Sequence, residues 1–311
     1  MKTMRYDQTL LSGHIPSSEV DNSADTRQDP LTVPIRSPRL RELADRVGAV
    51  LANYSTLGVA FSGGVDSTLL LTLAARQLGR EKVVAVVGVS PSLAHHEREQ
   101  AQRLAAALNI RCIDVHTREH ELSAYRRNNR DRCYYCKDEL FRKIQCEVVE
   151  KYGLVAVAYG ETAEDVGRGN RPGARAAKEH GVLHPLADAG LMKIQVRELA
   201  YELGLPNWNK PATPCLASRI PHSMEVTPKK LGQVEAAEAA LGRLGFDDLR
   251  VRHHGDIARI EVPLPLLDRV VVDPLRSLIV HAVITAGFRF VTVDLCGLRS
   301  GHLSNVTAND A

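Results

Sequence analysis

The sequence predicts an α/β protein in which a domain built on a parallel sheet is followed by a smaller α+β domain. Short apolar runs alternate with amphipathic helical segments from residue 37 to about residue 205, as in βαβ units. A glycine-rich turn follows the first of these runs. A Pro-rich stretch, 206–221, separates this region from one in which two strands flank a tight turn.

Composition excludes several classes of protein. Lys and Arg number 40 and Asp and Glu 37, so the net charge of +3 gives no bulk argument for a nucleic-acid partner. No apolar run approaches the roughly 20 residues of a membrane span, and the N-terminus lacks the apolar core of a secretory signal. We therefore expect a cytoplasmic protein. Its six cysteines would be core residues, ligands or reactive thiols.

Three regions are predicted along the chain. Residues 1–36 are rich in Ser, Thr, Asp, Asn and Arg without a period, which indicates a mobile extension. Ser37-Pro38 resembles a helix cap followed by a first-turn proline. The first domain is expected over 37–210 and the second over 211–311, with the boundary in the Pro-rich loop.

The elements of the first domain follow from hydrophobic periodicity. Strands are expected at Leu57–Phe61, Lys82–Val89, Cys112–Val115 and Leu154–Tyr159. Helices are expected at Asp66–Leu78, Leu93–Leu108, Asp138–Tyr152 and Lys193–Leu203. In such sheets ligands bind at the carboxyl ends of the strands.

The second domain shows a different order. A helix should begin at Thr227-Pro228, and strands near Leu249–Arg252 and Ile257–Val262 should form a hairpin around Gly255-Asp256. A helix near Arg276–Ala286 and a strand near Phe288–Leu295 complete the α+β domain.

The turn after the first strand has the features of a phosphate-binding loop. Glycines let the backbone approach an anion, and the following helix N-terminus adds free N–H groups and a favourable dipole. Hydroxyls can donate to phosphate oxygens, and Asp66 can orient magnesium or the phosphates. There is no Gly-Lys-Ser/Thr ending, so this is not the loop that cleaves the β–γ bond. The candidate nucleotide residues are Ser62, Gly63, Gly64, Asp66, Ser67 and Thr68.

Cysteines form a second candidate site. Cys133 and Cys136 make a C-x-x-C pair followed by Lys137, and Cys215 lies in the Pro-rich loop. Such a pair fits a redox dithiol, half of a zinc site or ligands to an iron–sulfur cluster. Three protein ligands would leave one coordination position open for chemistry. The other three, Cys112, Cys146 and Cys296, lie in apolar-patterned segments, where core packing is expected.

The string Ser-Gly-Gly-x-Asp-Ser-Thr resembles the pyrophosphate loop of the N-type, or PP-loop, ATP pyrophosphatases. That family splits ATP between its α and β phosphates and adenylylates a substrate oxygen, which a nucleophile then displaces. The whole set of motifs resembles the LarE family of sulfur transferases. The further matching strings are Cys133–Lys137, Arg171–Gly173, Trp208–Lys210, Pro214–Pro221, Arg250–Arg252, Asp256–Glu261 and Arg299–Gly301.

This resemblance implies a specific reaction. LarE enzymes use MgATP to adenylylate pyridinium-3,5-biscarboxylic acid mononucleotide and convert its carboxylates to thiocarboxylates, for the nickel-pincer cofactor of lactate racemase. In one subgroup a cysteine matching Cys215 is consumed as the sulfur source. In the other, cysteines matching Cys133, Cys136 and Cys215 hold a [4Fe-4S] cluster whose open iron carries sulfide. All three are present here, so the resemblance implies the cluster type, with Lys137 and Arg219 favouring thiolate.

One segment departs from the family pattern. Where the family has Gly-Thr-Asn, this chain has Gly160-Glu161-Thr162, and one residue is inserted before Arg171. Glu164 and Asp165 remain candidate carboxylates for magnesium, and Asp165 is the one we select.

Arginines provide a candidate substrate site. Arg250 and Arg252 alternate on one strand and share a face. With Arg299 they would hold a substrate phosphate, for which guanidinium groups are suited. A solvated strand face is the alternative. Glu238 and Glu261 match acidic positions of the family without an assigned role.

Other functions compete with this reading. A tRNA thiolation enzyme of the same superfamily is the closest, although charge disfavours it. An amidating synthetase would leave the cysteines idle, and a regulator that only binds nucleotide would release no pyrophosphate. The expected partners are the mononucleotide, sulfide or another sulfur donor, other cofactor-maturation proteins and further copies of the chain.

Overall fold

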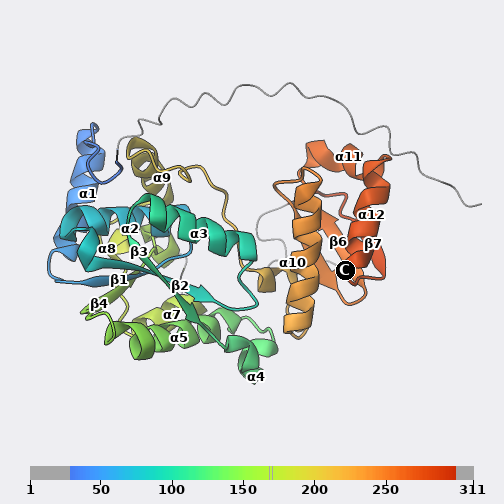
Figure 1. The fold of residues 1–311 in the computed structure, drawn as a ribbon, viewed down its shortest axis with the longest axis horizontal. Coiled ribbons are helices and arrows are strands. Elements are labelled where there is room, and N and C mark those ends of the chain that lie inside the picture. Colours follow the sequence, from blue (N-terminus) through green and yellow to red (C-terminus); the bar gives the residue numbers. More distant parts are fainter. Residues whose placement is uncertain (1–28, 168, 170, 299–311) are drawn as a thin grey trace, which may run out of the picture.

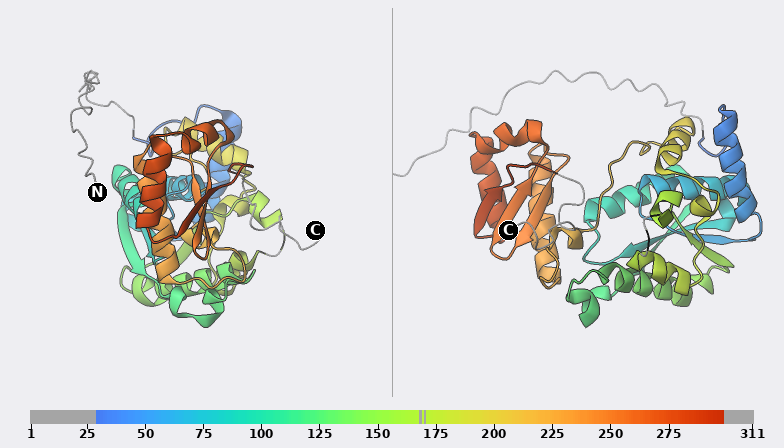
Figure 2. Two further views of the ribbon diagram at one scale, coloured as in Figure 1. Left: turned by 90° about the vertical axis from the view of Figure 1, so that its right-hand side faces the viewer. Right: turned by 180° about the vertical axis from the view of Figure 1, so that it is seen from behind.

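The computed structural model describes residues 29–167, 169 and 171–298, which form two lobes (Figure 1). The first lobe contains a four-stranded sheet and the second a three-stranded sheet. The predicted fold class is confirmed: a parallel α/β domain is followed by a smaller α+β domain. Seen from behind, the chain crosses between the lobes after α9 (Figure 2).

The first sheet is parallel throughout, in the order β3-β2-β1-β4. Its strands are β1 (Leu57–Ala60), β2 (Val83–Val89), β3 (Arg111–His116) and β4 (Ala156–Tyr159). The chain moves outward from β1 to β3 and then returns to place β4 on the other side of β1. The order therefore reverses between β1 and β4, and crevices at such reversals are where open α/β sheets bind ligands.

Helices cover both faces of this sheet (Figure 1). One layer consists of α1 (Pro38–Leu51), α2 (Val65–Leu78), α3 (His95–Ala107), α8 (Pro185–Asp188) and α9 (Lys193–Glu202). The other contains α5 (Arg132–Ile144), its π-helical continuation Gln145–Val149, and α7 (Pro172–Glu179). Along β2, Val83, Ala85 and Val87 face the first layer, whereas Val84 and Val86 face the second. Burial on both faces explains why this strand is apolar without alternation.

Short turns complete the first lobe and the crossing to the second. They are Arg80–Lys82, Glu119–Glu121, α4 (Ser123–Arg126), α6 (Ala163–Gly167) and Leu216–Arg219. One further short turn, Leu264–Leu266, belongs to the second lobe. The turn at Leu216–Arg219 packs into the core of the second lobe through Leu216 and Ala217.

The second lobe is the predicted hairpin with helices on one face. Its elements are α10 (Pro228–Arg243), β5 (Arg250–His254), β6 (Ile257–Glu261), α11 (Leu267–Val271), α12 (Leu275–Thr285) and β7 (Phe290–Val293). β5 and β6 are antiparallel, and β7 lies parallel to β6. Val251, Ala258 and Ile260 face the core with α10 and α12, so alternate residues of the sheet point the other way.

Two predictions about order and helix limits are wrong. Part of the extension predicted over 1–36 packs on the first lobe: Ile35 is buried, and Arg76 donates hydrogen bonds to the carbonyl oxygens of Pro30 and Val33 (both 2.8 Å). Residues 1–28 lie outside the described part. The helix expected from Asp138 begins instead at Arg132. Among the described residues, no helix has the length and apolar character needed to cross a membrane.

Candidate active site

The predicted phosphate loop lies between β1 and α2 and is held together by its own side chains. Thr68 Oγ1 (2.9 Å) and Ser67 Oγ (3.1 Å) both donate to the carbonyl oxygen of Gly64. Gly63 has a φ of +68°, and a Cβ there would lie 3.0 Å from the Cα of Ala101 on α3. Only glycine fits such a position without strain. The carbonyl oxygen of Gly64 thus has its hydrogen-bond donors within the loop. The N-terminus of α2, which follows directly, is a favourable place for an anion.

A cavity of about 310 Å³ opens beside this loop. Its lining includes Ser62, Gly64, Asp66 and Ser67 from the loop region, together with Lys137 from α5. The phosphate loop and Lys137, the residue that follows the Cys-x-x-Cys pair, therefore line the same cavity, whereas the cysteines themselves are not among its lining residues. Its volume is at the lower end of the range for small-molecule sites.

The end of β4 approaches the loop most closely. A Cβ on Gly160 would lie 2.8 Å from the backbone nitrogen of Ser67 and 2.9 Å from the carbonyl carbon of Asp66. Backbone on both sides leaves no room for a side chain. Gly160 therefore sets the distance between the two strand ends at the reversal point of the sheet.

The two predicted magnesium carboxylates share one cation, Lys193. Its Nζ lies 2.6 Å from Asp66 Oδ2 and 2.9 Å from Asp165 Oδ2, and Arg171 Nη1 lies 2.8 Å from Asp165 Oδ1. Burial would raise the pKa of Asp165, but the hydrogen bonds from Lys193 and Thr162 outweigh it and lower that pKa. Sequence reasoning missed Lys193, because a lysine at the start of a helix is ordinary and its partner lies 127 residues away.

Lys137 lies in a half-buried aromatic environment. Its Nζ is 4.0 Å from the centroid of the Tyr159 ring, a cation–π contact. Burial lowers the pKa of Lys137 to about 8, against an opposing effect of the Glu161 carboxylate. Glu161 is buried and accepts a hydrogen bond from the Tyr159 hydroxyl. Glu161, which departs from the family pattern, thus raises the pKa of Lys137 through its negative charge.

The three predicted cysteines gather where the lobes meet. Cys133 and Cys136 lie in the first two turns of α5, and Cys136 packs against the second core. Cys215 is exposed immediately before the Leu216–Arg219 turn. Arg132 Nη1 donates to the carbonyl oxygen of Ala217 (2.9 Å), which ties the start of α5 to that turn. Cys133 and Cys136 therefore lie within the helix and not before it, as the predicted helix start at Asp138 had implied.

The electrostatic surroundings of these thiols also differ from the prediction that Lys137 and Arg219 favour thiolate. Burial raises the pKa of the Cys136 thiol well above its usual value, and the charges of Glu119, Cys215 and Cys133 add to the effect. Arg219, expected to favour thiolate, is ion-paired with Glu238 (3.0 Å). Its charge is thus compensated. Within the described residues, no three or more His, Cys, Asp or Glu side chains lie together as a site for a metal ion.

The remaining cysteines are only partly as predicted. Cys112 is half-buried against the first core, whereas Cys146 and Cys296 are exposed. The prediction of core packing is wrong for these two, because Cys146 lies on the outer side of the π-helical turn and Cys296 follows the last strand.

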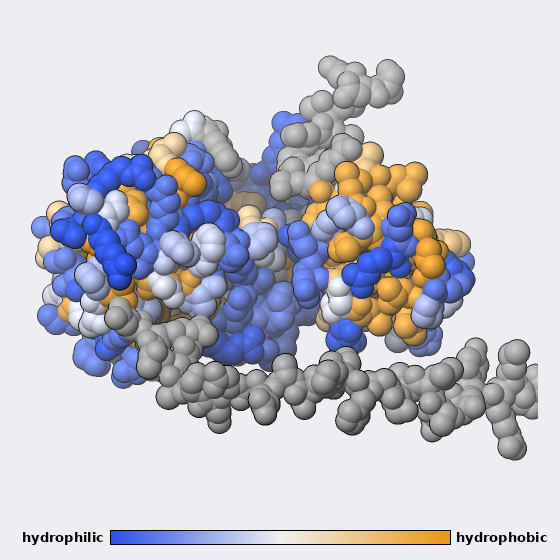
Figure 3. All heavy atoms as spheres, turned by 90° about the horizontal axis from the view of Figure 1, so that it is seen from above, coloured by the Kyte–Doolittle hydropathy of each residue, from blue (hydrophilic) through white to orange (hydrophobic). Residues whose placement is uncertain are grey.

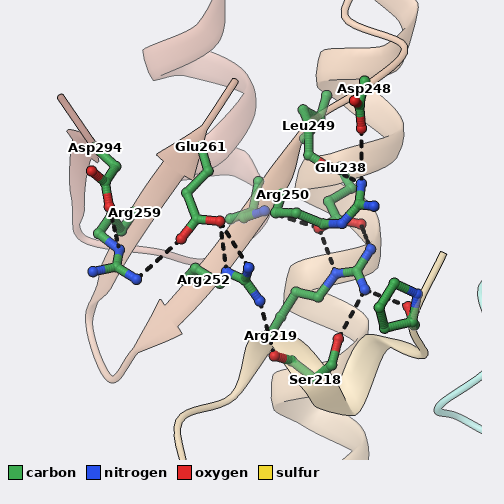
Figure 4. Close-up of polar contacts among 12 residues, drawn as sticks. Ser218, Arg219, Glu238, Asp248, Leu249, Arg250, Arg252, Arg259, Glu261 and Asp294 are labelled. Carbon is green, nitrogen blue, oxygen red and sulfur yellow. Dashed lines mark hydrogen bonds and ion pairs between the residues drawn. The ribbon is translucent and has the colours of Figure 1, made fainter. Parts of the chain in front are cut away.

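The arginines of β5 share a face, as their alternation predicts, but differ in their partners (Figure 4). Arg252 is buried; it lies 2.8 Å from Glu261 Oε2 and donates to the carbonyl oxygen of Ser218 (3.0 Å). The nearest carboxylate to Arg250 is Asp248, at 3.5 Å. Of this pair, Arg250 is therefore the one whose charge remains available. Arg299 lies outside the described residues.

The acidic residues without a predicted role have structural ones. Glu238 pairs with Arg219 and accepts from the backbone nitrogen of Val251 (2.9 Å). Glu261 pairs with Arg252 and with Arg259 (3.1 Å). The two carboxylates hold the buried guanidinium groups of Arg219 and Arg252, both of which also contact Ser218 (Figure 4).

Curated relatives share most of the chain. A pyridinium-3,5-bisthiocarboxylic acid mononucleotide synthase of Lactiplantibacillus plantarum is 37% identical over 261 residues, which cover 83% of this chain and 92% of the relative. The chain belongs to the LarE family. An uncharacterized protein of Synechocystis sp. is 42% identical over 248 residues, 80% of this chain and 91% of that protein. An uncharacterized Methanocaldococcus jannaschii protein is 27% identical over 204 residues, 66% and 76% of the two chains.

A broader family is also matched. A family model described as asparagine synthase matches residues 40–145. These residues run from α1 through α5 and include the phosphate loop. The chain is therefore a LarE-type enzyme with a PP-loop domain that uses ATP. The second lobe and the Cys215 turn lie outside this match.

Proposed function

We propose that the chain is an ATP-dependent sulfurtransferase that converts carboxylates of pyridinium-3,5-biscarboxylic acid mononucleotide to thiocarboxylates for a nickel-pincer cofactor. The observation that carries the proposal is the shared cavity of the phosphate loop and Lys137, which follows Cys136. Adenylylation and sulfur transfer act on one carbonyl carbon, so their groups must lie near each other. Family membership supports the same reaction.

The proposed reaction has two balanced steps. First, a carboxylate oxygen attacks the α-phosphorus of ATP, and pyrophosphate leaves toward the N-terminus of α2. Next, a sulfur nucleophile attacks the acyl carbon, the C–O bond breaks, and its electron pair leaves with AMP. Lys137 is placed to stabilise charge that develops in this cavity.

Magnesium fits the carboxylate pair. Asp66 and Asp165 both contact the ammonium group of Lys193. Their carboxylate oxygens are ligands that suit a hard cation, and phosphate oxygens would complete the coordination of that cation. When bound, magnesium neutralises phosphate charge. Asp66 and Asp165 would hold it, and Lys193 would remain as a fixed positive charge next to the pyrophosphate.

A [4Fe-4S] cluster fits the cysteine set. All six cysteines are free, which suits a reducing cytoplasm, and Cys136 is under the electrostatic influence of Cys133 and Cys215. The three thiolates would each hold one iron, so they need not approach as closely as ligands of a single ion. When bound, the cluster would supply replaceable sulfide for the transfer. The chain's own part is to hold three thiols at the lobe boundary.

Partners follow from the second lobe. Arg250, with its charge available, is proposed to bind the substrate phosphate. Apolar residues gather on the face of this lobe that Figure 3 shows. The large apolar side chains exposed on the lobe as a whole are Ile257, Leu264, Val271, Val272, Leu278, Val280, Ile284, Phe290 and Leu295. Such a patch is typical of an interaction site, which supports a homo-oligomer. Sulfide or another donor, and other maturation proteins, complete the expected set.

Pyrophosphate release tests this function. The wild type should release pyrophosphate from MgATP only when the pyridinium dicarboxylate is present. Ser67→Ala and Lys193→Met should each lower the rate by roughly 10²–10³, as expected for lost preorganised charge or donors, while Lys178→Met on the exposed side of α7 should not. Release stimulated by tRNA instead of the dicarboxylate would favour tRNA thiolation.

A further inference from the structure

The side chain of Asn207 connects the phosphate loop to the chain crossing between the lobes. Asn207 is 4% exposed, and its Nδ2 donates to the carbonyl oxygen of Gly63 (3.0 Å) and to Thr68 Oγ1 (2.9 Å). Both N–H groups of the amide are thus used on the two ends of one loop. Thr68 Oγ1 can accept this bond because its own hydrogen is donated to Gly64.

The residues after Asn207 are fixed to the same lobe. Lys210 Nζ lies 2.6 Å from Glu97 Oε2 and 2.6 Å from Gln100 Oε1, and Glu97 lines the 310 Å³ cavity. Arg197 donates to the carbonyl oxygens of Trp208 (3.1 Å) and Lys210 (2.9 Å). The start of the crossing is therefore tied to the nucleotide site at two points, Asn207 on the loop and Lys210 on α3.

Beyond Lys210 the chain is exposed until it reaches the second core. Residues 211–215 are all exposed, and Cys215 is the last of them. The next residue, Leu216, is buried, and its N–H donates to the carbonyl oxygen of Ser92 (2.9 Å). Five exposed residues thus lie between two anchors, with Cys215 next to the second. Within this span, the carbonyl oxygens of Ala212 (3.4 Å) and Cys215 (3.2 Å) accept hydrogen bonds from Arg250 and Arg219. A shift of the first anchor must be taken up within this short span.

We infer that Asn207 is a positioning residue that couples occupancy of the phosphate loop to the span carrying Cys215. This inference rests on the proposed function, in which ATP and Cys215 serve one substrate. Phosphates that bind the loop would shift its backbone, and with it the carbonyl oxygen of Gly63 and the hydroxyl of Thr68. The Asn207 amide, which is bonded to both groups, would pass this shift to the crossing segment. Among the residues that the structure describes, no other side chain donates a hydrogen bond that joins these two groups to the crossing segment.

Amide hydrogen exchange of the full-length protein tests this coupling. The probe is magnesium with an α,β-methylene analogue of ATP, which binds but is not cleaved. In the wild type, the analogue should change exchange in residues 212–216 by at least about threefold, since exposed segments exchange through low-energy opening. Asn207→Ala should raise the Kd of the analogue roughly tenfold, or about 1.4 kcal/mol, and abolish the exchange change at saturation.

The matched control is Asn209→Ala, an exposed asparagine in the same turn, which should behave as wild type. If Asn207→Ala does not fold, Asn207→Asp tests the inference instead, because it keeps the size of the side chain and replaces the donating NH2 group by an oxygen. A variant at 207 that retains both the affinity and the exchange change overturns the inference, as does an equal loss in Asn209→Ala. A wild type that does not bind the analogue would instead contradict the proposed function.

Discussion

Arg250 and Arg252 lie two residues apart on one face of β5, yet only one of them has a close carboxylate partner. Removing Arg252 would leave Glu261, which is 1% exposed, with only the more distant Arg259. Breaking a buried ion pair in this way costs about 3–5 kcal/mol. Arg250 does not belong to a buried ion pair, since its carboxylate partner Asp248 is exposed. Its positive charge can therefore bind a ligand.

Substitution should therefore separate the two arginines. Arg250→Ala should weaken binding of the mononucleotide by about 1.5–3 kcal/mol, the cost of a charge-assisted hydrogen bond, with little change in Tm. Arg252→Ala should mainly lower Tm. Arg289→Ala is the control, since its ion pair with Asp256 is exposed and worth about 0–1 kcal/mol. Calorimetry and thermal unfolding measure both effects, and unchanged substrate affinity in Arg250→Ala would remove it from the site.

Glu97 gives a pH-dependent prediction at the same scale. Burial would raise the pKa of Glu97, but hydrogen bonds from His96 and Lys210 outweigh it and lower the pKa from 4.5 to about 2. Between these values the unfolded chain binds more protons, so the stabilisation is complete above pH 4.5 and is lost as pH falls toward 2. Its size is on the order of 2–3 kcal/mol.

Denaturant unfolding of Glu97→Gln checks this sign. The variant should be less stable than wild type at pH 7, and the difference should close as pH falls from about 4.5 toward 2. Glu99→Gln, on the exposed side of α3, should show no such trend. A difference between Glu97→Gln and wild type that grows on acidification would mean that the pair with Lys210 does not stabilise the fold.

At the scale of elements, the end of β4 controls the phosphate loop through Gly160. Gly160→Ala places a Cβ against the backbone of Asp66 and Ser67, so the loop must move. We expect at least a tenfold loss of ATP affinity, about 1.4 kcal/mol. Gly167→Ala is the control, because a Cβ there meets nothing within 4 Å. Titration with ATP distinguishes them, and equal affinity in both would show that the loop tolerates displacement.

The same scale explains what the sequence can predict. β1, β2 and the hairpin of β5 and β6 were found because alternation and apolar runs are local signals. The start of α5 was missed because the buried residue of its first turn is the polar Arg132, so no apolar stripe marks the beginning of the helix. Lys193 and Asn207 were missed because their partners are 127 and 139 or more residues away, and no local pattern records such pairs.

At the scale of the whole molecule, the two lobes bring different parts of one reaction together. The first lobe supplies the loop, the carboxylates and Lys137, and the second supplies Arg250 and the core on which the Cys215 turn packs. Contacts between the lobes come from the start of α5, which carries Cys133 and Cys136, and also from α4 and the segment before α3. In the proposed function, sulfur transfer would therefore occur at the lobe boundary.

The sulfur source is the central claim, and one measurement addresses it directly. Anaerobically purified protein is supplied with MgATP, the pyridinium dicarboxylate and sulfide, and thiocarboxylate per chain is counted while intact mass is recorded. The cluster account predicts several thiocarboxylates per chain, an unchanged protein mass, and loss of turnover with cluster absorption in each Cys→Ser variant of Cys133, Cys136 and Cys215. One sulfur transferred per chain, with loss of one hydrogen sulfide from Cys215, would contradict it.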